Sequence, residues 1–146
     1  MTNDRDCLRD LTARYARCVD RRQFHELPEI MAPEMCLSVF MDPNATEPAH
    51  RMNGIVEIQQ AWQVLHRYES TFHCIGQQLI FDLTADQARG ETYCVAHHFH
   101  RKNGQAHAFR MYIRYQDRFV RVAGGWKFAE RRLIVDRTEG ENIDFN

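Results

Sequence analysis

The chain has 146 residues and a mass of 17.3 kDa, which fits one domain, because domains usually run to about 100–150 residues. Charged residues make up 27% of it and the formal net charge is −1, so electrostatics gives no reason to expect nucleic acid or an anionic membrane as partner. The five cysteines are odd in number, scattered and without a CxxC spacing, which argues against a disulfide framework or zinc site and favours a reducing compartment. The N-terminus is charged, and no run of about 18 apolar residues occurs. We expect a cytoplasmic protein with a single domain spanning residues 1–146.

The N-terminal segment Asn3–Arg22 has the pattern of one amphipathic helix. Thr2 or Asn3 can cap its first turn, because short polar side chains accept hydrogen bonds from the free backbone N–H groups there. The apolar positions recur at helical spacing and are Cys7, Leu8, Leu11, Tyr15, Cys18 and Val19. This face is expected to pack against the rest of the domain.

The next segment predicts a short helix, a strand and a long loop. Phe24–Met31 is expected to be helical and to stop at the Ala32-Pro33 step, since the residue before a proline avoids the α region. Met35–Met41 has the pattern of a strand. Asp42–Gly54 contains two prolines, two asparagines and a glycine, so we expect a loop long enough to cover a site. Whether it contributes a residue to that site stays open.

The second half predicts one helix and then a meander of strands. Ile55–Tyr68 is helical, with a buried stripe made of Ile55, Ile58, Trp62 and Leu65. Short turn-like segments separate the strands that follow, so consecutive strands must be antiparallel neighbours. These strands are Thr71–Leu83, Gln87–Arg101, Ala106–Val122 and Trp126–Asp136. The order of elements predicts an α+β domain in which a cone-shaped, curved antiparallel sheet wraps around the N-terminal helices and encloses one pocket.

Two acid/base residues stand out against this apolar pattern, Asp20 at the end of the first helix and His73 near the start of the first long strand. Strand alternation puts His73 on one face with Thr71, Ile75, Leu79 and Phe81. An imidazole among apolar neighbours is expected to be neutral and able to accept a proton. A carboxylate that reaches it fixes its tautomer and makes it a better general base.

Several stretches resemble the SnoaL-like branch of the nuclear transport factor 2-like superfamily. They are LRDLTARYARCVDRRQ, the Gly54-Ile55 helix start, STFHCIGQQLIFDLTADQARGE and the terminal GGWKFAERRL. The resemblance covers nearly the whole chain and implies the cone-shaped fold just described, as a single SnoaL-like domain. It is less specific for function, because this fold carries dehydratases, isomerases, polyketide cyclases, dehydrochlorinases, dioxygenase β subunits and binding modules without activity.

The resemblance suggests roles for five residues. In the lindane dehydrochlorinase of the superfamily a His-Asp pair removes a proton and a basic residue assists the leaving group, and the similar positions here are His73, Asp20 and Arg131. Where that enzyme has a lysine, this chain has Tyr15, which is similar to a tyrosine at the pocket of dehydratases acting on scytalone and bile acids. Scytalone dehydratase also uses a second histidine, for which His98 is the candidate by spacing.

Together these residues predict a cofactor-independent lyase or isomerase of the dehydratase type. His73 would take a proton from a carbon next to an electron-withdrawing group, and Asp20 would steady the imidazolium. Tyr15, His98 or Arg131 would stabilise the enolate or protonate a departing hydroxyl. Strand parity predicts an apolar and aromatic wall suited to a hydrophobic, ring-bearing small molecule: Phe40, Trp62, Tyr68, Cys94, Ala96, Met111, Ile113, Tyr115, Leu133 and Val135.

Each site residue also has a purely structural interpretation. Asp20 could form a surface ion pair with Arg21 or Arg22, and His73 and Tyr15 could be core packing residues. Arg131 could pair with Glu130, Asp136 or Asp117 as part of the sheet surface. His98 and His100 share a strand face and His107 lies in the next strand, but a third metal ligand is not evident, and the resemblance implies no metal.

Two other classes of function remain open. A non-catalytic ligand-binding or assembly subunit, similar to the β subunits of ring-hydroxylating dioxygenases, would keep the fold without needing the His-Asp pair. A polyketide-cyclase-like aldol enzyme would use the same base without a leaving-group acid. The strand AHAFRMYIRY would leave a broad apolar surface if alone, so a homodimer or homotrimer is expected.

Overall fold

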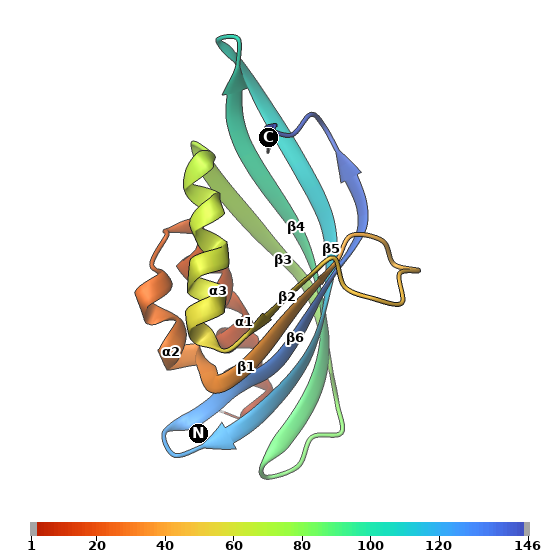
Figure 1. Ribbon diagram of the computed structural model, residues 1–146. Coiled ribbons are helices and arrows are strands. Elements are labelled where there is room, and N and C mark those ends of the chain that lie inside the picture. The colour runs from red at the N-terminus through yellow and green to blue at the C-terminus, as the bar shows by residue number, and fades with distance from the viewer. Residues whose placement is uncertain (1–2, 145–146) are drawn as a thin grey trace.

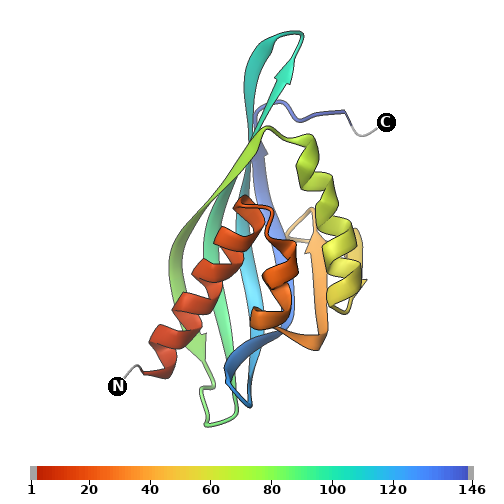
Figure 2. The same ribbon diagram turned by 90° about the vertical axis from the view of Figure 1, so that its left-hand side faces the viewer.

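The computed structural model describes residues 3–144 and shows three α-helices on one face of a six-stranded sheet (Figures 1 and 2). The sheet is strongly curved and stays open, with the helices against its concave face. The helices are α1 (Asp4–Asp20), α2 (Leu27–Ile30) and α3 (Ile55–Trp62), with 3₁₀ turns at Phe24–Glu26 and Gln63–Arg67. The strands are β1 (Met31–Phe40), β2 (His50–Asn53), β3 (Ser70–Phe81), β4 (Gln87–Lys102), β5 (Gln105–Val122) and β6 (Gly125–Glu139).

The strand order across the sheet is β2-β1-β6-β5-β4-β3. From β3 to β6 consecutive strands pair antiparallel, which confirms the meander that the short turns predicted. The sheet is not antiparallel throughout, because β1 pairs parallel to β6. This pairing brings the N-terminal half of the chain alongside the last strand, and the α+β class predicted from the sequence is confirmed.

Helix α1 follows the predicted pattern closely. The Asn3 side chain accepts a hydrogen bond from the Asp6 backbone N–H at 2.9 Å, so Asn3 is the N-cap; Thr2, the other candidate, lies outside the described residues. The predicted apolar face is buried from Leu8 to Val19. Because α1 packs across β3, its last residue, Asp20, arrives beside the start of that strand.

Three predicted boundaries in the first half were wrong. The predicted helix Phe24–Met31 is a 3₁₀ turn followed by α2, and β1 already begins at Met31. Pro33 is tolerated in β1 because the pairing with β6 is irregular between Met31 and Cys36. The predicted loop Asp42–Gly54 contains the four-residue strand β2, which pairs with β1; four residues are too few to show a clear alternation.

A bulge in β3 corrects the predicted face of that strand. Ile75 pairs with Cys94, whereas Gln78 pairs with Thr92, so two residues of β3 stand opposite one residue of β4. One extra residue reverses the alternation. Leu79 is consequently 59% exposed instead of sharing the inner face with His73, and the same reversal exposes Phe81, which is likewise corrected from the inner face.

The core lies between the helices and the middle of the sheet. Its largest fully buried side chains include Tyr15 from α1, Tyr115 and Phe119 from β5, and Phe128 from β6. The ring of Tyr15 meets those of Tyr115 and Phe128 edge-on, at centroid distances of 6.0 and 6.1 Å. Within residues 3–144, every helix is too short or too polar to cross a bilayer.

Candidate active site

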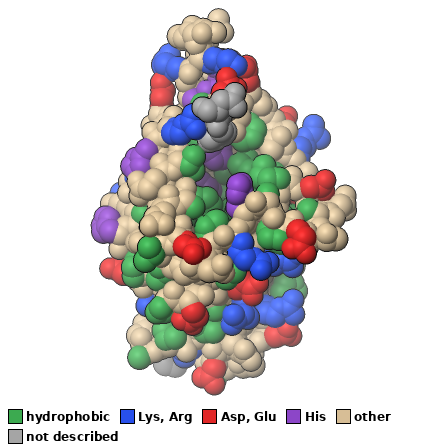
Figure 3. Space-filling view, in the orientation of Figure 1, with side chains coloured by type: hydrophobic (Ala, Val, Ile, Leu, Met, Phe, Trp, Pro, Cys, Tyr) green, Lys and Arg blue, Asp and Glu red, His purple; other side chains and the backbone are tan. Residues whose placement is uncertain are grey.

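A cavity of about 580 Å³ opens between the concave face of the sheet, the end of α1, and α3 with the 3₁₀ turn that follows it. This volume suits a small organic ligand. Figure 3 shows a hollow on this side of the molecule in which hydrophobic and histidine side chains gather. The cavity is lined by Tyr15, Val19, Val39, Met41, His50, Met52, Ala61, Trp62, Val64, Leu65, Tyr68, His73, Ala96, His98, Phe109, Met111, Ile113, Tyr115, Leu133 and Asn142.

Most of the wall residues expected from strand parity border this cavity. Three do not: Phe40, Cys94 and Val135. Side chains alternate between the two faces of a strand. Val39 and Met41 line the cavity, so Phe40, which lies between them, is on the other face. Cys94 and Val135 are buried in the packing of the sheet without bordering the cavity. The expected wall residues that do border it are Trp62, Tyr68, Ala96, Met111, Ile113, Tyr115 and Leu133.

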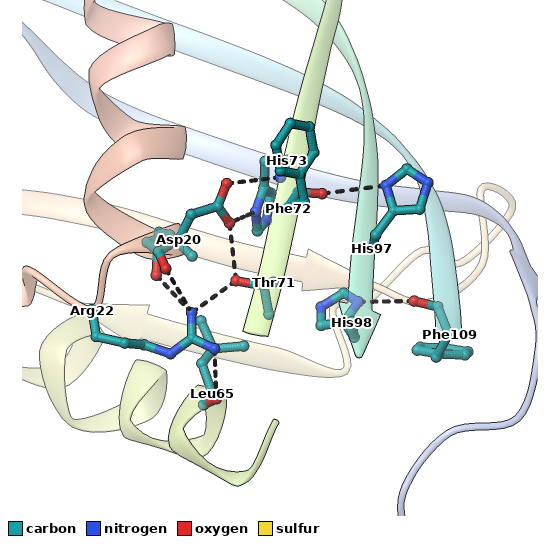
Figure 4. A network of polar contacts seen from close by, with 10 residues as sticks. Asp20, Arg22, Leu65, Thr71, Phe72, His73, His97, His98 and Phe109 are labelled. Carbon is teal, nitrogen blue, oxygen red and sulfur yellow. Dashed lines mark hydrogen bonds and ion pairs between the residues drawn. The ribbon is translucent and has the colours of Figure 1, made fainter. Parts of the chain in front are cut away.

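Asp20, at the end of α1, and His73, on β3, are in direct contact (Figure 4), and His73 lines the cavity. The Asp20 carboxylate accepts hydrogen bonds from the His73 backbone N–H at 2.8 Å and from the Thr71 hydroxyl at 2.9 Å. Its Oδ1 also lies 2.6 Å from His73 Nδ1. Burial alone would raise the pKa of Asp20, but the hydrogen bonds and charge of His73 outweigh burial and lower this pKa below its ordinary value. Asp20 is therefore a carboxylate that can only accept hydrogen bonds.

This geometry decides which nitrogen of His73 is free. Because an ionised carboxylate has no proton to give, the Asp20 contact requires the proton of a neutral His73 to sit on Nδ1. The other nitrogen, Nε2, then carries a lone pair, and His73 lines the cavity. The His73 side chain is only 8% exposed, so water competes weakly for this position. The arrangement is that of a general base oriented by a carboxylate.

His98 from β4 is a second imidazole on the same wall. Its ring centroid lies 6.3 Å from that of His73 and 4.9 Å from that of Tyr68. Nδ1 of His98 lies 3.3 Å from the backbone carbonyl oxygen of Phe109 and donates a hydrogen bond to it. Burial lowers the pKa of His98 to about 4, and the nearby charge of His73 adds to this. A neutral His98 offers Nε2 as an acceptor, which suits holding a ligand hydroxyl better than protonating a leaving group.

Tyr15 contributes a proton donor from the helix side of the cavity. Burial raises the pKa of its phenol to about 12, although the positive charge of Arg131 opposes the rise. Tyr15 thus keeps its O–H at neutral pH and can donate a hydrogen bond to a ligand oxygen. It lies on the same helix as Asp20, five positions earlier, so one element positions both groups.

Arg131 is completely buried and does not border the cavity. Its guanidinium binds Asp117 through two hydrogen bonds of 2.7 and 2.9 Å. It also lies over the rings of Tyr15, Tyr115 and Phe128, at 4.4, 3.7 and 4.4 Å from their centroids. Burial would lower the pKa of Arg131, but the Asp117 charge outweighs it and holds this pKa above its ordinary value. Arg131 therefore lies behind the rings of Tyr15 and Tyr115, which line the cavity. Its positive charge acts on the site by opposing the rise in the pKa of Tyr15.

Sequence reasoning missed several residues of the site. Arg22, seen only as a possible surface partner of Asp20, instead bonds to Thr71 and holds the end of α1. His50 and Met52 from the predicted loop line the cavity; their i, i+2 spacing was the available signal. Asn142 also lines the cavity from the C-terminal segment and accepts a hydrogen bond from the Tyr68 hydroxyl at 2.6 Å, a position that no pattern marked.

His100 and His107 pair across β4 and β5 and do not line the cavity. His100 and His107 stack at 5.3 Å, and His100 Nε2 lies 2.6 Å from the Glu141 carbonyl oxygen. Across residues 3–144, no three His, Cys, Asp or Glu side chains are grouped so as to hold a metal ion. Burial raises the pKa of the Cys94 thiol to about 12, which makes it a poor nucleophile at neutral pH.

Comparison with known proteins now identifies the class. The SnoaL-like domain family matches residues 1–132, and the chain belongs to this family. This confirms the resemblance noted in the sequence and places the fold in the SnoaL-like branch of the nuclear transport factor 2-like superfamily. No curated protein matches the sequence.

Three solved structures illustrate the range of similar folds. A candidate scytalone dehydratase from Novosphingobium aromaticivorans is 20% identical with a TM-score of 0.76, covering 94% of this chain and 87% of that one. A hexachlorocyclohexane dehydrochlorinase from Novosphingobium barchaimii is 18% identical with a TM-score of 0.77, covering 97% and 93%. The β subunit of a candidate aromatic-ring-hydroxylating dioxygenase from N. aromaticivorans is 20% identical with a TM-score of 0.73, covering 94% and 90%. At these identities the likeness establishes a shared fold.

Proposed function

We propose that this protein is a cofactor-independent lyase or isomerase, of the dehydratase type, that removes a proton from a carbon acid with His73 as the base. The observation that carries the proposal is the contact between Asp20 Oδ1 and His73 Nδ1 at 2.6 Å. It leaves Nε2 of His73, which borders an apolar cavity, as a proton acceptor. A positioned general base of this kind contributes roughly 10²–10⁴-fold to a rate.

The first step follows from the positions of these groups. His73 Nε2 takes a proton from a carbon next to a carbonyl or similar electron-withdrawing group, and the C–H electron pair moves into an enolate. The imidazolium that forms is stabilised by the ionised carboxylate of Asp20. The Tyr15 O–H stabilises the enolate oxygen by donating a hydrogen bond, and its raised pKa keeps this proton in place.

The second step decides between elimination and isomerisation. In an elimination the enolate electrons form the C=C bond and the C–O bond breaks, and the departing oxygen takes a proton from Tyr15 or from the His73 imidazolium to leave as water. In an isomerisation the imidazolium returns its proton to a different carbon. In both reactions the protons and electrons are exchanged between the substrate, His73 and Tyr15, so neither reaction requires a cofactor.

The cavity supports a hydrophobic, ring-bearing substrate. Its volume of about 580 Å³ accommodates a compound of one to three rings, because ligand cavities of about 300–1,000 Å³ hold drug-sized molecules. Most lining residues are apolar, and two imidazoles, those of His73 and His98, lie close together on the wall formed by β3 and β4. The similar folds of a candidate scytalone dehydratase and a dehydrochlorinase support elimination chemistry.

Two observations favour a second candidate, aldol ring closure of the polyketide-cyclase type. Arg131 does not border the cavity, and the pKa of His98 is lowered to about 4. Two of the groups considered as leaving-group acids are therefore poorly placed for that role. A cyclisation needs the same base but no such acid, so product analysis must look for ring closure as well as elimination.

The experiment is a screen for deuterium incorporation from D₂O into ring-bearing β-hydroxy ketones and simple ring ketones such as 2-tetralone, followed by NMR. We expect wild type to exchange or eliminate at the carbon next to the carbonyl, and His73→Gln and Asp20→Asn to lose this activity. Activity that survives in both variants contradicts the proposed base. Binding of the same compounds without any exchange supports instead a non-catalytic subunit, to which the fold shared with a dioxygenase β subunit gives precedent.

We also infer that the protein forms a homodimer or homotrimer. Phe72 and Tyr93 are 61% and 42% exposed on the adjacent strands β3 and β4, and a contact between copies of the chain would remove these large apolar side chains from water. Light scattering on the purified chain measures the mass of the particle directly, and a monomer at micromolar concentration would contradict the inference.

A further inference from the structure

Arg22, two residues past the end of α1, occupies a backbone position that does not suit it. Its φ is +58°, the left-handed conformation in which helices commonly end on glycine because a side chain is strained there. Its backbone N–H closes the helix end by donating to Val19 O at 3.1 Å. Glycine would serve this turn without strain, so the arginine side chain must be explained by what it touches.

The guanidinium of Arg22 ties three elements together (Figure 4). Nη1 donates to the Val19 carbonyl at 2.9 Å, at the end of α1, and to the Thr71 hydroxyl at 2.7 Å, on β3. Nη2 donates to the Leu65 carbonyl at 2.9 Å, in the 3₁₀ turn after α3. Burial lowers the pKa of Arg22, opposed by the charge of Asp20, but an arginine remains protonated at any working pH.

These contacts set the direction of the neighbouring hydrogen bonds. An arginine can only donate, so the Thr71 oxygen must accept from Arg22. The single hydroxyl proton of Thr71 then points to Asp20 Oδ1, 2.9 Å away. Asp20 Oδ1 accepts from Thr71 and, at 2.6 Å, from His73 Nδ1. A chain of donors thus runs from Arg22 through Thr71 to Oδ1 of the carboxylate, whose Oδ2 accepts from the His73 backbone N–H. Together these bonds hold the carboxylate in the orientation that receives the proton of His73 Nδ1.

We propose that Arg22 is a positioning residue that, through the Thr71 hydroxyl, fixes the Asp20 carboxylate and holds the His73 proton on Nδ1. The inference rests on the proposed function, because the tautomer matters only if Nε2 of His73 is the base. Arg22 does not line the cavity, so its removal changes how the base is held and leaves the ligand contacts in place. The same guanidinium couples the turn after α3, which borders the cavity, to the base.

The test uses Arg22→Gly, because glycine relieves the strained backbone and keeps the turn while removing the guanidinium. Thr71→Val removes the hydroxyl relay at similar volume. Arg21→Gln is the matched control, since Arg21 is the exposed neighbouring arginine. Circular dichroism melting confirms that each variant is folded. The ¹⁵N and ¹H NMR signals of the His73 ring, assigned by their absence in His73→Gln, report the tautomer without any substrate.

In wild type and Arg21→Gln we expect one Nδ1–H tautomer with a downfield proton protected from exchange. In folded Arg22→Gly and Thr71→Val we expect this proton signal to broaden or vanish and the ring to populate both tautomers. In both variants the kcat for deuterium exchange into 2-tetralone should fall at least tenfold with little change in KM. The kcat of the double variant Arg22→Gly/Thr71→Val should be no lower than that of either single variant.

An unchanged His73 signal in folded Arg22→Gly overturns the inference. The two failures are separable, because the NMR signature needs no activity. If wild type shows the Nδ1–H signature and Arg22→Gly loses it while no compound exchanges, the proposed function fails and the positioning role stands. If wild type is active and the signature survives in Arg22→Gly, the positioning role fails alone.

Discussion

Two pairs of a carboxylate and a basic side chain, Asp20–His73 and Asp117–Arg131, have little exposed surface and serve different ends. Asp20 and His73 meet where α1 crosses β3, and His73 lines the cavity. Asp117 and Arg131 pair across β5 and β6 in full burial, and neither borders the cavity. Both pairs place a basic group beside an acid at hydrogen-bond distance. They differ in whether the basic group keeps a free atom facing the cavity.

The comparison shows why residue type alone does not identify a catalytic group. The aromatic rings of Tyr15, Tyr115 and Phe128 surround the guanidinium of Arg131, so a basic residue expected at the site is sealed behind its wall. His73 differs because Asp20 occupies only one of its two nitrogens. A buried ion pair that does not border the cavity serves structure, whereas a base that is held from one side and lines the cavity can act on a ligand.

The largest effect is expected on activity from Asp20→Asn. The substitution removes the negative charge that stabilises the His73 imidazolium, so deuterium exchange into 2-tetralone should fall by roughly 10²–10⁴-fold. The melting temperature should change by only a few degrees. Asp10→Asn, an exposed aspartate on the same helix, is the control and should keep full activity. Equal activity of Asp20→Asn and Asp10→Asn would show that the Asp20 carboxylate does not support the base, and Asp20–His73 would then be a structural pair like Asp117–Arg131.

The buried pair Asp117–Arg131 is expected to affect stability and not activity. Arg131→Met leaves Asp117 buried without its partner, which should lower the free energy of unfolding by about 3–5 kcal/mol in urea titrations. The double variant with Asp117→Leu should recover most of this loss, because no charge is then left unpaired. Arg118→Met removes an exposed arginine on the same strand as Asp117 and should cost less than about 1 kcal/mol. A mild effect of Arg131→Met would mean that water reaches the pair.

His98 predicts a pH dependence of stability. Its pKa in the folded protein is lowered to about 4, whereas an unfolded histidine titrates near 6.5. Between these values the unfolded chain binds the extra proton, so this contribution is complete above about pH 6.5 and is lost as the pH falls towards 4. At about 1.4 kcal/mol per pKa unit the loss is on the order of 3 kcal/mol.

Urea titrations of wild type and His98→Gln at pH 7 and 4.5 test this expectation. The free energy of unfolding should fall less between pH 7 and pH 4.5 in His98→Gln than in wild type, by on the order of 3 kcal/mol. An equal decline in both proteins would show that His98 carries its proton in the folded state, and its role as a neutral acceptor on the His73 wall would be lost.

The smallest effect is expected from Tyr15→Phe. Tyr15 lies on the same helix as Asp20, and its ring contacts the guanidinium of Arg131. The ring keeps its packing, and only the hydroxyl that would donate to a ligand oxygen is removed. We expect about a tenfold drop in exchange, the equivalent of one hydrogen bond, with a free energy of unfolding within about 1 kcal/mol of wild type. A drop as large as that of Asp20→Asn would make Tyr15 a proton donor in the rate-limiting step.

Much of the fold could be predicted because its signals are local. The helical spacing from Asn3 to Val19 and the alternation along β4 to β6 each repeat over many residues. The pairing of β1 with β6 and the bulge after Ile75 depend on contacts far apart in the chain. The bulge alone moved Leu79 from the expected inner face to solvent.

The site was predictable to a similar degree. Asp20 and His73 could be found because each is a polar residue at the end of an apolar pattern, and the structure brings them into contact. No pattern could show that Arg131 turns towards Asp117 and away from the cavity, since strand parity gives a face but not a depth. Arg22 was hidden for another reason: its contacts with Thr71 and Leu65 arise at a residue with a positive φ, which sequence does not report.

The most direct measurement compares deuterium exchange into 2-tetralone by Asp20→Asn with exchange by the double variant Asp117→Leu/Arg131→Met, at a temperature where both are folded. We expect Asp20→Asn to lose at least two orders of magnitude in exchange rate. The double variant should stay within about tenfold of wild type, because only the indirect effect of Arg131 on Tyr15 is lost. Loss of exchange in the folded double variant, with activity kept in Asp20→Asn, would contradict the assignment of His73 and Asp20 as the working base.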